Sequence, residues 1–589
     1  MFNSSLQKIG GCTLAAALLL AAGIAHAADA KIDKQALGQP PQGSNITVSP
    51  AGQHAAWQAT QGSRAVMVVD GVTGSPFDEL LLDPSGGTVA FSNDGSRYAY
   101  FGRNGSDYSL IVNGKEMVHG PVGSSGPYSR SLAFSPGGKH VFYLESDSTK
   151  GYRLVMDGTP GPWSSNGGLG PAFSPNDEHY AYNGPEREDS NKWFTVIDGK
   201  QHDFVGNDLQ YTGDGRLISI MPTSDGQVLM VNGLPVAKAA NIGKVWAAPT
   251  GPHYAAAVQP AGKDQVLYMD GKPVADCTSP GDVIFSSDGK HYAATCSAGT
   301  GRAFVLIDGK KGQEYTVIDH VAFAPDSATA IYVARNSQYK TFVVVGGKEF
   351  GPYAGLVATD SSDSGLVMSR TGGHYLFASE YRVGVPEEVV YDGKQMQFDG
   401  YELRYKPALS ANGARYAFAA FKSGNAGLVV DGKLLDGVAP EGFQAWPGDQ
   451  GYPPLVLLSP DGKHVVYVAT PAGKKNEWAL FVDDKPVFPD PKRQTLQLLA
   501  FTPDGKHLYW EAHAESNRPG PDDHMIYVDG KAALQIHPSS FDGLPSAWHM
   551  DADGAVQFLS VGDDGTVLRY RITPSSDTNV QTLVSAAGS

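Results

Sequence analysis

A short motif, in its fullest form Ala-Phe-Ser-Pro-Asp-Gly-Lys-His-Tyr, recurs along most of this chain of 589 residues. Thirteen copies can be recognised, from SPAGQHAAW at Ser49 to the most divergent, HMDADGAVQF, at His549. Their turn positions run from Gly52 to Gly554, which gives a mean spacing of about 42 residues. A period of this length is typical of propeller blades and excludes a single continuous core, because each repeat packs only against its neighbours.

A second motif follows each of the first twelve copies and ends in a turn pair: Asp-Gly at Asp70, Asn-Gly at Asn113 and Gly-Gly at Gly346. These pairs all tolerate the positive φ angles that a type I′ hairpin turn requires. The first motif, Ser-Pro-Asp-Gly, suits a type I turn, because proline presets φ at its second position and glycine accepts the fourth. Two turns in each repeat connect four short strands, as in a four-stranded blade.

The runs between the turns are apolar at successive positions, for example Val141–Glu145 and Phe194–Ile197. Strands that are buried on both faces show this pattern, and blades packed between two neighbours contain such strands. The chain also has 71 Gly and 39 Pro and only 18% charged residues, which disfavours a helical bundle. We therefore predict an all-β fold: tandem β-propellers built from about thirteen four-stranded blades.

Thirteen blades exceed the usual four to eight of one propeller. We therefore expect two propellers, residues 28–317 and 318–575, with a boundary near residue 317. The segment 576–589 is small and polar, and we expect a frayed C-terminal tail or a closing strand.

The first 27 residues have the pattern of a cleavable signal peptide. Lys8 precedes a short apolar run, Thr13–Ile24, and Ala25-His26-Ala27 matches a small-x-small cleavage site. We predict cleavage after Ala27 and export to the periplasm or the cell exterior. No later apolar run has the length of a membrane span, so we do not expect the chain to be embedded in a membrane.

Two cysteines, Cys277 and Cys296, remain after this cleavage, and an oxidising compartment favours their pairing. The turn at Ser286–Gly289 centres a hairpin between them. In an antiparallel pair, opposed residues have a constant index sum. The sum of 575 at this turn differs by two from that of the cysteines, so a bulge or local bend would bring them together. We predict a disulfide; the alternative is a pair of buried free thiols.

The repeats, such as AFSPGGKHVFY from Ala133 and LSPDGKHVVY from Leu458, resemble the WD-like repeats of the TolB propeller family and the propeller domains of prolyl oligopeptidases. The resemblance covers about residues 45–575 and implies a propeller fold; membership of the TolB group would imply a periplasmic interaction platform. The repeats begin near Val48, so we expect no equivalent of TolB's N-terminal α/β domain. Peptidase activity is not expected either, because the sequence has no GxSxG nucleophile motif.

The net charge of −16 disfavours nucleic acid as a partner, because nucleic acid is a polyanion. The sequence also lacks a phosphate-binding GK[ST] loop and the HExxH zinc motif, and we expect no cofactor. Eight histidines occupy one repeat position, where we expect them to serve the repeat. The remaining candidates for a Zn²⁺ or Ca²⁺ site lie in the last blades, where turn chemistry is the alternative role: His513, His524, His537, His549, Asp551 and Asp553.

Two tryptophans, Trp163 and Trp446, lie in Gly/Pro-rich loops and are candidates for an exposed ligand face. The favoured hypothesis is an exported, non-enzymatic platform that binds a protein or an envelope component. The alternative is a propeller-type enzyme for a glycan or lactone, with residues from many blades lining a central channel. The sequence leaves the ligand and the oligomeric state open.

Overall fold

The computed structural model describes residues 30–81, 89–121, 127–187, 192–202, 206–299, 301–325, 328–357, 365–380, 388–398, 402–403, 407–422, 425–435, 456–469, 478–490, 494–514, 524–536, 548–562 and 564–586. Within these ranges the chain forms strands throughout, apart from turns, connections and one short helix, α2 (Val580–Ala586). The predicted signal peptide and its cleavage site lie outside the described residues. No helix in the described ranges is long and apolar enough to cross a membrane.

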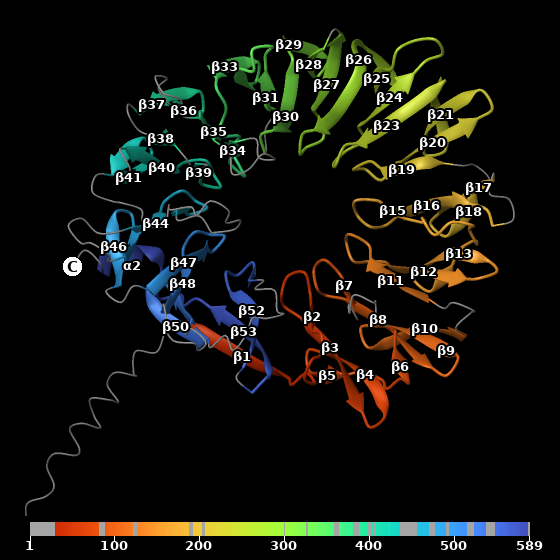
Figure 1. Ribbon diagram of the computed structural model, residues 1–589, viewed down its shortest axis with the longest axis horizontal. Helices are drawn as coiled ribbons and strands as arrows, with labels where there is room; N and C mark the ends of the chain where they lie inside the picture. Colours follow the sequence, from red (N-terminus) through yellow and green to blue (C-terminus); the bar gives the residue numbers. More distant parts are fainter. Residues whose placement is uncertain are drawn as a thin grey trace, which may run out of the picture.

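The described strands form twelve antiparallel sheets, one of which, with seven strands, contains two blades that share strand β26. This gives thirteen blades, and Figure 1 shows them following one another around a single ring. The predicted multi-blade, all-β propeller architecture is confirmed.

Blade 1 contains β2 (Thr47–Val48), β3 (Ala55–Gln61), β4 (Arg64–Val69) and β5 (Val72–Thr73), and blade 2 contains β6 (Glu79–Leu80), β7 (Ala90–Phe91), β8 (Tyr98–Asn104), β9 (Asp107–Val112) and β10 (Lys115–Pro121). Blade 3 contains β11 (Pro127–Phe134), β12 (Val141–Asp147), β13 (Gly151–Met156) and β14 (Thr159–Pro160), and blade 4 contains β15 (Ala172–Phe173), β16 (Tyr180–Pro185), β17 (Trp193–Ile197) and β18 (Lys200–His202). Blade 5 contains β19 (Asn207–Tyr211), β20 (Leu217–Thr223), β21 (Gly226–Val231) and β22 (Leu234–Ala239), and blade 6 contains β23 (Asn241–Ala247), β24 (Tyr254–Gln259), β25 (Val266–Met269) and β26 (Lys272–Phe285).

Blade 7 contains β26 again with β27 (Tyr292–Gly299), β28 (Arg302–Ile307) and β29 (Lys310–Tyr315); blade 8 contains β30 (Val317–Phe323), β31 (Ala330–Arg335), β32 (Thr341–Val345) and β33 (Lys348–Tyr353); and blade 9 contains β34 (Leu366–Met368), β35 (Tyr375–Ala378), β36 (Glu388–Tyr391) and β37 (Lys394–Gln397). Blade 10 contains β38 (Glu402–Leu403), β39 (Ala408–Leu409), β40 (Tyr416–Lys422), β41 (Asn425–Val430) and β42 (Lys433–Leu435), and blade 11 contains β43 (Val456–Leu458), β44 (Val465–Ala469), β45 (Trp478–Val482) and β46 (Lys485–Asp490). Blade 12 contains β47 (Gln494–Phe501), β48 (Leu508–Ala514), β49 (His524–Val528) and β50 (Lys531–Ile536), and blade 13 contains β51 (His549–Met550), β52 (Val556–Val561), β53 (Val567–Thr573) and β1 (Lys31–Gly38).

Both predicted turns adopt the expected backbone. In the second motif of the first blade, Asp70 and Gly71 have φ angles of 49° and 79°, the two positive values of a type I′ turn, and most later blades repeat this pattern. In the first motif, the Gly52 N–H donates to the Ser49 carbonyl over 2.8 Å. These turns set the register of each hairpin and fix which residues face the neighbouring blades.

The ring is closed by the two ends of the chain. Strand β1 is the outermost strand of the last blade and pairs antiparallel with β53, from Lys31 opposite Thr573 onward. Leu37 of β1 is buried in a cluster with Trp57 of the first blade and Val567 of the last. The N-terminal strand therefore joins the last blade to the first.

The expectation of a frayed tail or closing strand at 576–589 is wrong for its described part. Residues 580–586 form helix α2, in which Val580 and Val584 lie one turn apart and pack into a buried cluster with Trp510. The apolar residues of this segment have helical spacing, and the closing strand comes from the N-terminus instead.

Residue 317, the expected boundary between two propellers, is the first residue of β30. Ala293 and Val305 before it pack in one buried cluster with Ala330 and Tyr332 after it, as neighbouring blades do elsewhere in the ring. Residues 28–317 do not close on themselves, because β1 pairs with β53. The structure thus differs from the expected arrangement of two separately closed propellers.

Candidate binding surface

The ring has two unlike faces, which follow from the antiparallel order of strands within each blade. The turns between the first and second strands and between the third and fourth strands lie at one end, which we call the turn face. The second-to-third hairpin loops and the connections between blades lie at the other end, the loop face. The first motif and the Asp-Gly pair therefore meet on the turn face in every complete blade.

Eight histidines of the first motif bind the aspartates of the second motif on this face. In each pair the imidazole Nδ1 lies 2.5–2.9 Å from Oδ2 of the aspartate of the same blade. The pairs are His54–Asp70, His140–Asp157, His179–Asp198, His253–Asp270, His291–Asp308, His374–Asp392, His464–Asp483 and His507–Asp529.

Each aspartate also accepts a backbone hydrogen bond through its other oxygen, as Asp70 Oδ1 does from the Ala55 N–H over 3.2 Å. The pair thus ties the second strand of the blade to the turn between the third and fourth strands. The histidines also contact the next blade: the His54 ring stacks on Phe91, with centroids 6.3 Å apart. The repeated histidines therefore hold turns and neighbouring blades together.

The histidine–aspartate pairing was not predicted from the sequence, although both residues recur at equivalent places in the two motifs. Where the turn residue is asparagine, at Asn113 and Asn232, an arginine replaces the histidine, at Arg97 and Arg216. The Arg97 guanidinium donates to the carbonyl of Gly138 in the next blade over 2.7 Å. Arginine also occupies the histidine position at Arg415, where its guanidinium donates to the turn residue Asp431 over 2.8 Å.

Several carboxylates of the two turn motifs have lowered pKa values. Burial raises the pKa of Asp70, but the hydrogen bond and charge of His54 and the charge of Arg569 outweigh it, so the net shift is downward. Asp483 shows the same balance between burial and its contacts with His464, and its pKa is also lowered. Burial likewise opposes the Lys506 and Thr502 contacts that lower the pKa of Asp504 to about 2.

We therefore expect acid to destabilise the protein. A carboxylate with a lowered pKa in the folded state stabilises the fold above its unfolded pKa of about 3.9, and this contribution is lost as the pH falls through the folded pKa. The free energy of unfolding should fall between about pH 4 and pH 2, measured by urea denaturation across that range. Asp70→Asn should flatten the slope, and a stability that is constant down to pH 2 would contradict the prediction.

The described metal-site candidates lie in the last two blades. His513 and His524 lie opposite each other in the ladder of β48 and β49, and His537 lies outside the described residues. In the last blade, His549 Nε2 lies 3.4 Å from Asp551, and the Arg571 guanidinium binds both Asp551 and Asp553. No group of three or more His, Cys, Asp or Glu side chains placed to hold a metal ion occurs in the described ranges.

Of the two tryptophans proposed for an exposed ligand face, only Trp163 lies in the described part of the chain. Trp163 lies on the loop face, in the connection between β14 and β15, and is half-buried. The Arg153 guanidinium lies 4.4 Å from its ring centroid and is itself bound to Glu145 over 2.7 Å. Its ring is thus engaged in an internal cation–π contact. Trp446 lies outside the described residues.

The predicted disulfide between Cys277 and Cys296 is present, with the Cα atoms 5.2 Å apart. The ladder starts with Phe285 opposite Tyr292, one position later than the predicted turn centre. Register shifts on both sides of Pro280 then bring Cys277 to Cys296. These irregularities are the local bends that the index sum required.

Breaking this disulfide should lower the free energy of unfolding by about 3 kcal/mol, because the bond closes a loop of about 20 residues in the unfolded chain. The measurement is urea denaturation of the wild type with and without reductant, compared with the Cys277→Ala/Cys296→Ala variant. Reductant should leave the variant unchanged. Peptide mapping that finds two separately alkylatable thiols in oxidised protein would rule out the bond.

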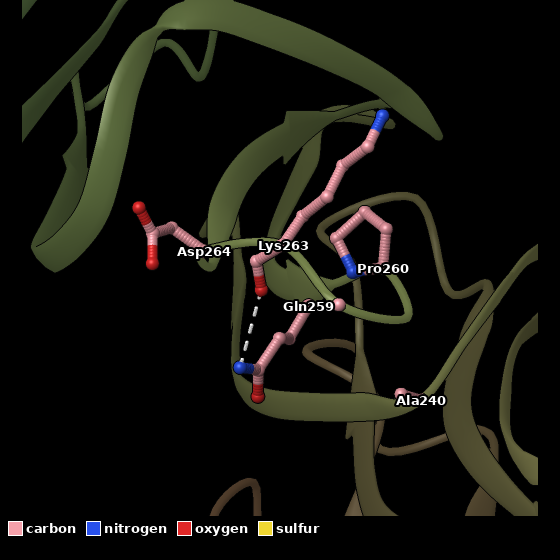
Figure 2. A pocket seen from close by; sticks show the side chains of 6 residues that line it. Ala240, Gln259, Pro260, Lys263 and Asp264 are labelled. Atoms are coloured by element: carbon pink, nitrogen blue, oxygen red, sulfur yellow. Dashed lines mark hydrogen bonds between the residues drawn. The ribbon is translucent and has the colours of Figure 1, made fainter.

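The loop face has a shallow hollow of about 590 Å³ between the β22–β23 connection and the loop after β24 (Figure 2). Its lining is polar and includes the side chains of Gln259, Lys263 and Asp264. The Gln259 side-chain amide donates to the Lys263 carbonyl over 3.3 Å and holds the loop. On the turn face, a second hollow of about 370 Å³ lies between two His–Asp pairs, His253–Asp270 and His291–Asp308.

Exposed aromatic side chains also occur on the loop face. Tyr339, in the loop between β31 and β32, is 80% exposed, and Tyr152 and Trp193, near the starts of β13 and β17, are each 38% exposed. Tyr339 has a φ of 57°, which bulky residues rarely adopt. The Asn336 side chain accepts hydrogen bonds from the backbone N–H groups of Gln338 and Lys340 and so fixes the loop that presents this ring.

No protein-family model matches the chain, and no curated protein sequence matches it. Solved structures that resemble it include a eukaryotic initiation factor (12% identity, TM-score 0.25, 62% of this chain and 90% of that chain). Hydrazine synthase from Kuenenia stuttgartiensis is another, with 13% identity and a TM-score of 0.17 over 53% of this chain and 96% of that chain. A third is a structure described as TolB from Agrobacterium tumefaciens, with 13% identity and a TM-score of 0.19 over 34% of this chain and 81% of that chain. TM-scores this low support no functional argument.

Proposed function

We propose that this protein is an exported, non-enzymatic binding platform that holds a protein or envelope component on its loop face. The observation that supports this proposal is the exposure of Tyr152, Trp193 and Tyr339 on that face. Tyrosine and tryptophan are enriched among the residues that dominate binding energy at protein interfaces. Loops that vary on a rigid scaffold are the usual carriers of recognition.

The contacts on the turn face are consistent with binding on the loop face. There the chemistry-bearing side chains of successive blades are engaged in the same histidine–aspartate contacts, such as His374 Nδ1 to Asp392 over 2.6 Å. These contacts stabilise the scaffold, whereas the loop face carries side chains that differ from blade to blade.

The test is retention of envelope components on immobilised full-length mature protein. The variant Tyr152→Ser/Trp193→Ser/Tyr339→Gly should lose at least tenfold in retention, as expected for loss of several aromatic contacts. The matched control is Leu234→Ser/Val236→Ser, which removes apolar side chains of comparable exposure from outer strand β22. Equal retention by the aromatic variant and the wild type would overturn the proposal.

The export part of the proposal has its own test. The protein recovered from the periplasm or the medium should begin at Ala28 in N-terminal sequencing, as cleavage after Ala27 requires. Recovery of the intact N-terminus from the cytoplasmic fraction would contradict it.

A further inference from the structure

We infer that the hollow of about 370 Å³ on the turn face, between blades 6 and 7, is a binding site for an arginine side chain of a partner protein. This inference goes beyond the proposed function and does not depend on the aromatic side chains of the loop face. Two observations carry it: the residues that line the hollow, and an arginine of this chain that fills the equivalent place between blades 2 and 3.

Apolar and acidic side chains line this hollow together. Met269, Phe285 and Tyr292 supply the apolar part, and they lie half-buried at the edge of a buried cluster between the two blades. Asp270 and Asp308 supply the acidic part, and the side chain of each is 39% exposed. A ligand that matches both parts has an apolar stem and a cationic end, as an arginine side chain does.

The charges around the hollow favour a cation. Burial raises the pKa of Tyr292, and the negative charges of Asp308 and Asp270 raise it further, so both carboxylates act on the same phenol. The one lysine of the lining, Lys290, is paired with Asp288, with Nζ 3.2 Å from the carboxylate. The two lining histidines bind the lining aspartates through Nδ1, as described above.

An arginine of this chain occupies the equivalent place between blades 2 and 3. Arg97 holds the motif position in blade 2 that His253 holds in blade 6. Its guanidinium lies 4.9 Å from the ring centroid of Phe134 in blade 3 and donates to the carbonyls of Gly138 and Lys139 over 2.7 and 2.6 Å. A planar guanidinium can stack on an aromatic face and donate to two acceptors at once, which a histidine cannot do with the same reach.

The same receiving groups line the hollow in blade 7. Phe285, Gly289 and Lys290 hold the motif positions of the aromatic ring and the two carbonyls that receive Arg97. Within the described residues, no ring or cation stacks on Phe285, and neither of the two carbonyls accepts a hydrogen bond. The hollow therefore combines an aromatic face and two available acceptors with the reach of a guanidinium.

Similar cross-blade contacts hold the two junctions. The Thr250 hydroxyl donates to the carbonyl of Ser287 in blade 7 over 2.8 Å, and the Asn93 amide donates to the carbonyl at the same motif position, Pro136 in blade 3, over 3.0 Å. Elsewhere the histidine itself covers the aromatic residue of the next blade, as His179 does by stacking on Tyr211 with ring centroids 6.5 Å apart.

The test is an NMR titration, observed on the ligand, of N-acetyl-L-arginine methylamide into the full-length mature protein. The capped amino acid presents the side chain as a protein chain does. The capped citrulline analogue has nearly the same shape but no charge, and it should bind at least fivefold more weakly because it loses the cation–π contact and the charged hydrogen bonds. Free arginine is the third probe and should bind no more tightly than the capped form.

Protein variants locate the binding. His253→Arg/Asp270→Asn copies the residues of blade 2 into blade 6, so an arginine of the chain should fill the hollow and weaken probe binding at least tenfold. His179→Arg/Asp198→Asn makes the same change in blade 4 and is the matched control, which should leave the affinity unchanged. Phe285→Leu removes the aromatic face without a large change in volume and should weaken binding at least threefold; it keeps the test possible if the first variant does not fold.

Several results would overturn the inference: no binding of the capped arginine, equal affinity for the arginine and citrulline analogues, or wild-type affinity in the variants of the hollow. Tighter binding of free arginine than of the capped form would indicate a site for the amino acid and would overturn the assignment to a partner protein. The loop-face variant Tyr152→Ser/Trp193→Ser/Tyr339→Gly should bind the probe as the wild type does, so the titration succeeds or fails separately from the test of the proposed function.

Discussion

Removal of residues 28–38 is expected to cause the largest loss of stability of any short deletion in this protein. The deletion eliminates β1, leaves the edge of β53 unpaired and removes Leu37 from the cluster between the last and first blades. The melting temperature should fall sharply, measured by calorimetry, because the ring loses its closing interface. A truncated chain that unfolds at the wild-type temperature would show that β1 is dispensable.

A point variant keeps this prediction testable if the truncated chain does not fold. Leu37 is 2% exposed, and Leu37→Ala should lower the free energy of unfolding by about 2–5 kcal/mol, the usual cost of this truncation in a packed core. Ala36→Ser, at the exposed position next to Leu37 in the same strand, is the matched control and should change it by less than about 0.5 kcal/mol.

Asp177→Ala should have the second largest effect. Asp177 is 2% exposed, and its Oδ2 accepts hydrogen bonds from the Gly137 N–H (2.9 Å), the Lys139 N–H (3.3 Å) and the Ser135 hydroxyl, all in the turn of the preceding blade. Removing the carboxylate leaves these donors unsatisfied at a buried interface. We expect a loss of about 3 kcal/mol or more in the free energy of unfolding.

Two comparisons make this result specific. Glu178→Ala changes the neighbouring, exposed carboxylate and should have little effect. Asp177→Gly relieves the positive φ of 58° but still removes the acceptor, so it should be milder than alanine and still destabilising. If Asp177→Ala and Glu178→Ala gave the same urea midpoint, the hydrogen bonds across the interface would contribute nothing measurable.

The sequence predicted those parts of the fold that are encoded locally. Asp70-Gly71 specifies its turn through the φ angles that these two residues tolerate, so the hairpins and the number of blades could be counted. Cys277 and Cys296 lie in one hairpin, so their pairing was also predictable, although the register shifts at Pro280 were not.

Ring closure could not be predicted in the same way. Strand β1 carries no repeat motif, only Leu37 among its residues is buried, and its partner β53 lies more than 500 residues away in the chain. Periodicity therefore suggested two propellers of ordinary size. The tail was predicted wrongly because a helix of seven residues with two inward valines, Val580 and Val584, carries too little pattern to distinguish a helix from a strand.

The candidate site was only partly visible for a similar reason. Trp163 was placed correctly in a loop, but the Arg153 guanidinium that packs on its ring comes from β13, ten residues earlier. Tyr339 shows no signal in the sequence, because its exposure and its positive φ become apparent only when the loop between β31 and β32 is formed.

The pairing of β1 with β53 also has a consequence for the order of events during synthesis. Residues 31–38 are made first, yet the strand that they join is completed only after residue 573 has been added. Until then the outer faces of the first and last blades have no partner, and Trp57 and Val567 remain accessible to other apolar surfaces. Contacts this distant in sequence form slowly and expose intermediates to aggregation. The ring can therefore close only after its last blade has formed.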